Sequence, residues 1–144
     1  MSMTEDPFDL ERFVEAQEGV YPRVCAELRA GHKRSHWMWF VFPQVRGLGS
    51  SPTAQRFGIS CADEARAYLR HSILGARLRE CTQLVLDIQG PSAHAIFGSP
   101  DDLKFRSCMT LFACASAEAL FSSALQKYFA GVADSLTLEL LEAT

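Results

Sequence analysis

Residues 98–115 read Gly98-Ser99-Pro100-Asp101-Asp102-Leu103-Lys104-Phe105-Arg106-Ser107-Cys108-Met109-Thr110-Leu111-Phe112-Ala113-Cys114-Ala115, and this stretch decides the fold. It opens with a helix start, in which Ser99 is the expected cap, Pro100 the first helical residue, and an aspartate stands at the third position. After its first turn the predicted helix is apolar on nearly all sides, which is typical of a helix buried in a core. We therefore expect the other elements to pack around it.

Helical patterns also dominate the chain on either side of this stretch. Apolar residues recur at helical spacing through residues 10–28, 62–88 and 116–130, and serines that suit a cap precede short helices at 52–57 and 92–97. The last pattern, residues 134–142, predicts a helix, although its alternation would also suit an edge strand. The sequence thus predicts an all-α fold, a single compact domain over residues 1–144 with about six to eight short helices around a buried helix near residues 101–115.

Two local signals predict where further helices begin. Asp6 precedes a proline and can cap the free backbone amides of a first helix. Ser60-Cys61-Ala62-Asp63 is a variant of the capping box, with aspartate in place of the usual glutamate. A helix is therefore expected directly behind each of these segments.

The composition excludes several classes of protein. With 48% hydrophobic and 22% charged residues, the chain has enough apolar material for a packed core and does not fit a disordered protein. The net charge of -3 does not fit a protein that binds nucleic acid through bulk positive charge. Between Glu27 and Asp63, however, no acidic residue occurs while several cations do, so we expect a local positive field there.

The cysteines and the N-terminus predict a cytoplasmic protein that does not enter a membrane. The five cysteines are odd in number and form no Cys-x-x-Cys motif, so they suit small apolar residues in a reducing compartment. The N-terminus is acidic, unlike a secretory signal, and the apolar run 37–42 is too short to span a bilayer.

The stretch from Gly31 to Gly49 carries the densest set of functional candidates. It combines two histidines and several cations with both tryptophans of the chain. Such residues suit an anionic ligand, because cations neutralise phosphate and an indole ring can stack on a base or sugar. In the alternative interpretation both tryptophans anchor the core and the charges are solvated. The apolar run 37–42 fits either a buried strand or a short helix.

A second cluster lies at the start of the central helix. Asp102 could orient a ribose hydroxyl or act as a general base, although capping and the helix dipole also explain an aspartate there. Lys104 and Arg106 lie on an otherwise apolar helix, so they either extend to the surface or point into a polar cavity.

A metal site is not predicted. His32 and His36 have the spacing of two ligands on one helix face, but Lys33 and Arg34 stand between them and repel a cation. No third ligand is signalled, and we expect neither a metal nor another cofactor.

Several motifs occur together in this chain: Asp6-Pro7-Phe8-Asp9-Leu10, Ser35-His36-Trp37-Met38-Trp39-Phe40-x-Phe42-Pro43-Gln44 and Asp101-Asp102-x-Lys104-x-Arg106-Ser107. A sequence with these motifs resembles an uncharacterised bacterial family of about this length whose members sometimes carry the label calpastatin. The resemblance spans nearly the whole chain and implies a mainly α-helical fold, without an established activity. A calpain inhibitor is long, repetitive and disordered, so that label does not fit this compact chain.

The chain is also similar in layout to helical N-glycosidase-like proteins linked to ADP-ribose and riboflavin intermediates. The similarity is carried by Ser50-Ser51-Pro52 and by the helix ending near Phe97-Gly98. It implies hydrolysis of an N-glycosidic bond, but the catalytic glutamate of that family has no clear counterpart here.

We weigh two functions of different classes. In the first, a phosphorylated or nucleotide-like small molecule binds in a pocket with His36 or Asp102 as the catalytic base if the protein is a hydrolase; the expected ligand-binding residues are Lys33, Arg34, Trp37, Trp39, Arg46, Lys104 and Arg106. In the second, the protein is a non-enzymatic interaction module that uses the aromatic stretch 36–43 as a docking or self-association surface. The ligand and the oligomeric state stay open.

Overall fold

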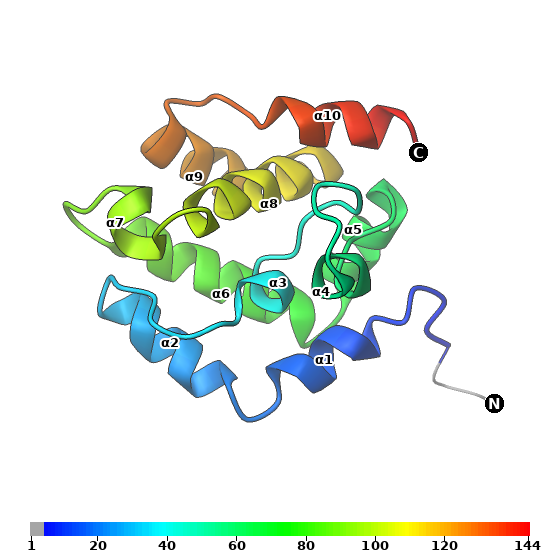
Figure 1. The fold of residues 1–144 in the computed structure, drawn as a ribbon, viewed down its shortest axis with the longest axis horizontal. Helices are drawn as coiled ribbons and strands as arrows, with labels where there is room; N and C mark the ends of the chain where they lie inside the picture. The colour runs from blue at the N-terminus through cyan, green and yellow to red at the C-terminus, as the bar shows by residue number, and fades with distance from the viewer. Residues whose placement is uncertain (1–4) are drawn as a thin grey trace.

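The computed structural model describes residues 5–144, and this part of the chain forms ten helices and no strand beyond one isolated bridge between Val45 and Ile59 (Figure 1). In chain order the helices are α1 (Glu11–Gln17), α2 (Tyr21–Arg29), α3 (Met38–Val41), α4 (Pro52–Arg56), α5 (Ala62–Arg70), α6 (Leu74–Asp87), α7 (Ala93–Phe97), α8 (Asp101–Ala115), α9 (Ala119–Phe129) and α10 (Ser135–Glu142). The predicted all-α fold is confirmed.

The α8 helix is the centre of the molecule, as the sequence predicts. It contacts α3, α5, α7, α9 and α10, and its side chains Phe105, Met109 and Phe112 are fully buried. Figure 1 shows α10 along one side of α8, while α1 and α2 form the opposite edge of the molecule. The expectation that the other helices pack around this one is confirmed for these five, while α1 packs on α3 and α2 packs on α6.

Aromatic rings join α8 to the apolar run that follows Trp37. The Phe105 ring meets the Phe42 ring edge-on at a centroid distance of 5.0 Å and stacks on the Phe97 ring at 4.8 Å. Contacts of this kind each add about 0.5–1.5 kcal/mol beyond the burial of area. They fix the segment after α3 against the N-terminal half of α8.

The structure has ten helices in residues 5–144, where six to eight were expected. The five-residue helices α4 and α7 correspond to the short helices expected at 52–57 and 92–97. The apolar run 37–42, for which strand and helix were both open, contains the single turn α3. The alternation in the last segment is part of helix α10, which begins after Asp134. The Asp134 carboxylate accepts a hydrogen bond from the Thr137 amide at 2.9 Å.

Two of the expected caps are wrong. Ser99 does not cap α8, because Pro100 holds the cap position and the Asp102 amide bonds to the Gly98 carbonyl at 2.9 Å. The Ser60 box also fails, since Cys61 holds the cap position of α5 and makes no side-chain capping bond. In its place the Glu64 carboxylate, from inside α5, bonds to the Ser60 amide at 2.8 Å.

The buried Glu64 carboxylate also forms an ion pair that the sequence pattern does not reveal. Arg12 Nη2 lies 2.8 Å from Glu64 Oε2, and both side chains are buried. The same guanidinium donates to the carbonyl oxygens of Phe8, Asp9, Arg56 and Gly58. Arg12 therefore links α1 to α5 and to the end of α4.

Asp6 acts as predicted, although the helix begins later than expected. Its two carboxylate oxygens accept from the amides of Leu10 at 2.7 Å and Glu11 at 2.9 Å, at the start of α1. All five cysteines are free, and three of them, Cys25, Cys81 and Cys108, are buried. Among the helices of residues 5–144, none has the length and apolar character needed to cross a membrane.

Candidate functional site

The cationic stretch begins where α2 ends in a tight turn. Gly31 adopts a φ of +74°, its amide bonds to the Leu28 carbonyl at 3.0 Å, and the His32 amide bonds to the Glu27 carbonyl at 3.1 Å. These two bonds define a Schellman turn, in which glycine supplies the left-handed conformation at least cost. The chain is thereby turned back toward α8.

The Glu27 side chain then holds the stretch in place. Its carboxylate accepts from the amides of Arg34 at 2.8 Å and Ser35 at 3.1 Å, from the Ser35 hydroxyl, and from Trp37 Nε1 at 2.9 Å. Burial acts to raise the pKa of Glu27, but these hydrogen bonds outweigh it and lower the pKa to about 2. Glu27 is therefore ionised, and its carboxylate holds Trp37 and the neighbouring residues in position.

The two tryptophans have different roles. Trp37 is 2% exposed and packs on Phe42 at a ring distance of 6.1 Å, so it belongs to the core. Trp39 is only half-buried, and Lys104 Nζ lies 4.1 Å from the centre of its ring. The core-anchor interpretation holds for Trp37, whereas Trp39 presents a ring face next to a cation.

Asp101 joins two of the predicted cations. Lys33 Nζ lies 2.8 Å from Asp101 Oδ2, and Lys104 Nζ lies 3.2 Å from Asp101 Oδ1. Lys33 also donates to the Ser35 carbonyl at 2.6 Å. A small cavity of about 90 Å³ opens beside this group, and it is lined by Lys33, His36, Met38, Trp39, Asp101 and Lys104.

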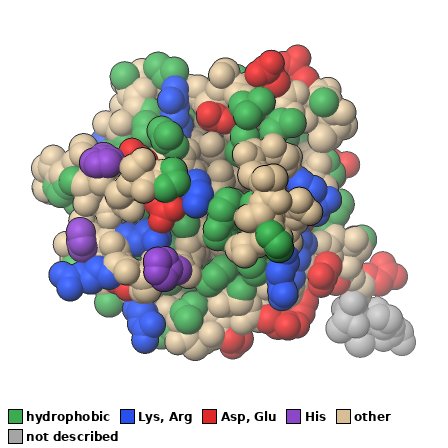
Figure 2. All heavy atoms as spheres, viewed as in Figure 1, with side chains coloured by type: hydrophobic (Ala, Val, Ile, Leu, Met, Phe, Trp, Pro, Cys, Tyr) green, Lys and Arg blue, Asp and Glu red, His purple; other side chains and the backbone are tan. Residues whose placement is uncertain are grey.

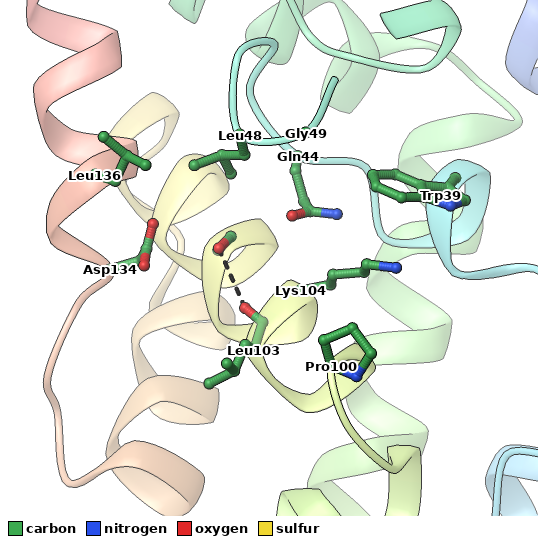
Figure 3. A pocket seen from close by; sticks show the side chains of 10 residues that line it. Trp39, Gln44, Leu48, Gly49, Pro100, Leu103, Lys104, Asp134 and Leu136 are labelled. Carbon is green, nitrogen blue, oxygen red and sulfur yellow. Dashed lines mark hydrogen bonds between the residues drawn. The ribbon is translucent and has the colours of Figure 1, made fainter. Parts of the chain in front are cut away.

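A larger cavity, drawn in Figure 3, shares two lining residues with the small one. Its volume is about 300 Å³, and it lies between the segment around α3, the start of α8 and the start of α10. The lining residues are Trp39, Gln44, Leu48, Gly49, Pro100, Leu103, Lys104, Ser107, Asp134 and Leu136. Trp39 and Lys104 line both cavities, so the two lie next to each other at these residues.

Gln44 is the unusual residue of the larger cavity. It is 6% exposed, and its Nε2 is buried without a hydrogen-bond partner. Its backbone is fixed, because its carbonyl accepts from the Ile59 amide at 2.8 Å. Figure 3 shows the Gln44 amide directed into the cavity toward Trp39 and Lys104. A buried unpaired donor costs about 1–3 kcal/mol, so native proteins rarely retain one without a reason.

The wall around Trp39 is closely packed. A Cβ atom placed on Gly49 would lie 2.9 Å from Ala54 Cβ and 3.4 Å from the Trp39 ring. The loop between α3 and α4 therefore lies against the indole, which leaves the ring little freedom to change its orientation.

The remaining polar groups of the larger cavity are already engaged. The Ser107 hydroxyl donates to the Leu103 carbonyl at 3.1 Å, the bond drawn in Figure 3. The Asp134 carboxylate accepts from the amide and the hydroxyl of Thr137, at 2.9 and 2.5 Å. Gln44 and Lys104 are thus the groups with donors available for a ligand.

The structure brings together four of the predicted site residues: Lys33, His36, Trp39 and Lys104. Of the others, Trp37 is buried in the core, and Arg34 is exposed and lines neither cavity.

Three further predicted residues make contacts outside both cavities. Arg46 Nη2 donates to the Gly58 carbonyl at 3.3 Å. Arg106 donates to the carbonyls of Val132 at 2.9 Å and Ala133 at 3.2 Å, which ties the connection between α9 and α10 to α8. Asp102 Oδ2 lies 3.5 Å from His94 Nδ1, and it does not share the small cavity with His36.

Sequence reasoning missed Gln44 as a site residue. The one signal in the sequence is a polar residue that follows an apolar run directly, after Pro43. Whether such a side chain finds a partner depends on residues 49, 59 and 104, and their proximity is a property of the fold. Within residues 5–144, no cluster of three or more His, Cys, Asp or Glu side chains has the arrangement of a metal site.

Histidines gather on the side of the molecule that carries the small cavity. His32, His36 and His94 are exposed, and Figure 2 shows histidine and Lys/Arg side chains over α7 and the connection between α2 and α3. His36 also lines the small cavity, so the cavity lies beside this region.

Comparison with known proteins places the chain in a family. A family model described as "Protein of unknown function (DUF1810)" matches residues 7–141. The crystal structure of the conserved hypothetical protein Rv1873 from Mycobacterium tuberculosis is similar, with 61% sequence identity and a TM-score of 0.95 over 96% of this chain and 100% of that one. No curated protein matches the chain.

The recognition of an uncharacterised helical family from the sequence motifs is thus confirmed, and the fold is shared with a solved relative over almost the full length. The chain is a member of the DUF1810 family, whose function is unknown.

Proposed function

We propose that this protein binds a small planar molecule in the cavity lined by Gln44, Trp39 and Lys104. The observation that carries the proposal is the Gln44 amide, which is buried, has no partner for its donor, and faces the cavity. A ligand oxygen beside Gln44 Nε2 would accept the missing hydrogen bond and remove the cost of the unpaired donor.

The size and the walls of the cavity support a ligand of this class. A volume of about 300 Å³ is at the lower end for small-molecule sites, which span roughly 300–1,000 Å³. The walls are largely apolar, with the Trp39 ring opposite Leu48, Leu103 and Leu136. A flat ring would fit between these apolar walls, and its polar edge would meet Gln44.

The charge of the site supports a ligand with a carbonyl or anionic oxygen. Lys104 has one carboxylate contact, to Asp101 at 3.2 Å, and its ammonium lies above the Trp39 ring. An ammonium group has three donors, so it retains the capacity to bond a ligand oxygen. Gln44 and Lys104 would then both donate hydrogen bonds to the polar edge of the ligand.

Binding is better supported than hydrolysis. Hydrolysis of an N-glycosidic or phosphate bond needs a base within hydrogen-bond reach of the reacting water. The carboxylate that lines the larger cavity is Asp134, and its Oδ2 accepts two hydrogen bonds from Thr137. Of the two bases predicted from sequence, Asp102 faces His94 and His36 lines the neighbouring small cavity.

The interaction-module alternative receives less support. In the stretch 36–43 the apolar residues Trp37, Met38, Val41 and Phe42 are almost fully buried. A docking surface requires exposed apolar area, and the apolar area of these residues is buried in the core.

The test is a thermal-shift screen of small ring compounds that carry carbonyl or anionic oxygens, with the wild type and Gln44→Leu in parallel. A compound at one hundred times its dissociation constant should stabilise the wild type by about 2.7 kcal/mol. The variant should respond much less, because it has lost the recognising amide. Gln83→Leu, which changes an exposed glutamine on α6, is the matched control. Equal stabilisation of all three proteins by the same compound would contradict the proposal.

A further inference from the structure

The smaller cavity carries information about the ligand that the larger cavity alone does not. Trp39 and Lys104 line both cavities, so a molecule in the larger one that reaches past these two side chains would enter the smaller one. The smaller volume, about 90 Å³, corresponds to roughly three water molecules. It is too small for a ring but has room for a compact polar group.

The charges around the small cavity are not balanced. Two ammonium groups, of Lys33 and Lys104, share the single carboxylate of Asp101. The Lys33 side chain is 7% exposed, so its charge is largely withdrawn from water. A buried positive charge without full compensation is costly, and an anion placed between the two ammonium groups would relieve that cost.

The other charged groups nearby do not supply the missing negative charge. The Glu27 carboxylate is held by Ser35, Trp37 and the Arg34 amide. Asp102 faces His94 at 3.5 Å. His36, which is exposed and lines the small cavity, adds a further donor for an anion.

We propose that the ligand is a phosphomonoester of a small planar ring compound. Its ring would lie against Trp39 beside Gln44, and its phosphate would lie in the small cavity among Lys33, Lys104 and His36. This assignment rests on the binding function proposed above and names the class of ligand for the same site. A phosphate carries a charge of about −1.5 to −2 at neutral pH and three acceptor oxygens, one for each of Lys33, Lys104 and His36.

The experiment compares matched pairs of compounds with and without the phosphate. Uridine with uridine 5′-monophosphate, adenosine with adenosine 5′-monophosphate, and pyridoxine with pyridoxine 5′-phosphate are titrated into the full chain by calorimetry. In at least one pair the phosphorylated member should bind about tenfold or more tightly, because one charge-assisted hydrogen bond is worth that much. A ring carboxylate, benzoate, tests whether any anion suffices, and binding of benzoate as tight as the best phosphate would overturn the phosphate assignment.

Variants of the lysines test whether the affinity gained from the phosphate comes from the small cavity. Lys33→Gln should abolish the gain that the phosphate confers, and Lys104→Gln, whose side chain is more exposed, provides a second test if the first variant does not fold. Arg34→Gln is the matched control, since it removes a positive charge one residue from Lys33 without changing either cavity lining. A phosphate gain that persists in both lysine variants, or that is lost in Arg34→Gln, would overturn the proposal.

The outcomes separate this proposal from the one on which it rests. If unphosphorylated rings bind in a Gln44-dependent way and the phosphate adds nothing, the phosphomonoester assignment fails and the binding function stands. If no compound of any pair binds and the wider screen of ring compounds is also silent, both fail.

Discussion

Glu27 accepts four hydrogen bonds from the segment that follows α2, and this makes its protonation a determinant of stability. Its pKa is lowered to about 2 in the folded protein, against about 4.3 in an unfolded chain. A carboxyl group with a lowered folded pKa stabilises above its unfolded pKa, and that contribution disappears as the pH falls through the folded pKa.

We therefore predict that Glu27→Gln destabilises the protein at neutral pH by about 1.5–3 kcal/mol, the usual value for hydrogen bonds to a charged group. The difference in unfolding free energy between wild type and variant should shrink as the pH falls from about 4.3 toward 2. Urea unfolding at a series of pH values measures it. Glu139→Gln, at an exposed position on α10, is the control, and a difference that does not change with pH would disprove the role of the charge.

The second prediction at this scale concerns the buried ion pair. Arg12→Met leaves the Glu64 carboxylate buried without its counter-ion, and breaking such a pair costs about 3–5 kcal/mol. Chemical denaturation should show this loss. The exposed pair of Asp63 and Arg66 is the comparison, because Arg66→Met should cost at most about 1 kcal/mol. Similar losses of unfolding free energy in the two variants would contradict the burial of the Arg12–Glu64 pair.

Substitution of Gln44 is predicted to increase the stability of the protein rather than lower it. In the absence of ligand, Gln44→Leu should stabilise the protein by about 1 kcal/mol, because it removes an unpaired donor and keeps the side-chain volume. Thermal unfolding of the ligand-free protein measures this gain. A loss of stability would mean that the amide is needed for the fold rather than for a ligand.

At the scale of single residues the sequence could predict chemistry but not orientation. The cations and tryptophans of residues 31–49 were identified as candidates, yet Trp37 and Trp39 differ in role because α3 turns one indole to the core and the other to the cavity. The partners of two further residues could not be predicted either. Arg106 bonds to Val132, which is far away in the sequence, and Asp102 lies beside His94, which is on another helix.

Elements were easier to predict than residue contacts. Long periodic segments such as α6 and α9 follow directly from their apolar spacing, whereas α8 follows from its start signal and its apolar character on nearly all sides. The caps were less predictable, because Ser99 and Ser60 are both suitable in type. The Gly98 carbonyl accepts from the Asp102 amide that Ser99 would have capped, and Ser60 donates its own amide to Glu64. The turn α3 could not be distinguished from a strand, since six apolar residues carry no period.

The position of α10 depends on a clamp at the preceding connection. Arg106 donates to the carbonyls of Val132 and Ala133, and the Thr110 hydroxyl accepts from the Asp134 amide at 2.9 Å. Arg106→Gln should therefore loosen α10 and accelerate its amide hydrogen exchange by about tenfold or more, with α2 unaffected. Exchange followed by mass spectrometry measures this, with Arg23→Gln as control. Equal exchange in α10 of wild type and variant would rule out the clamp.

At the scale of the whole molecule, one core is organised around α8. Phe105 meets rings from the segment after α3, from α7 and from α9, so Phe105→Ala removes a contact common to all of them. A loss of about 3–5 kcal/mol is expected in chemical denaturation. Leu103→Ala, two residues earlier and 54% exposed, should cost far less. Comparable losses would contradict a core centred on Phe105.

The central claim, a ligand cavity at Gln44, is tested most directly by amide NMR of the wild-type protein. Small ring compounds are added while the Gln44 side-chain amide and the two indole N–H signals are followed. We predict saturable shifts of the Gln44 and Trp39 signals, with the Trp37 signal, whose N–H is held by Glu27, as the internal reference. If no compound shifts the Gln44 amide, or if those that bind shift only signals outside the cavity, the claim is contradicted.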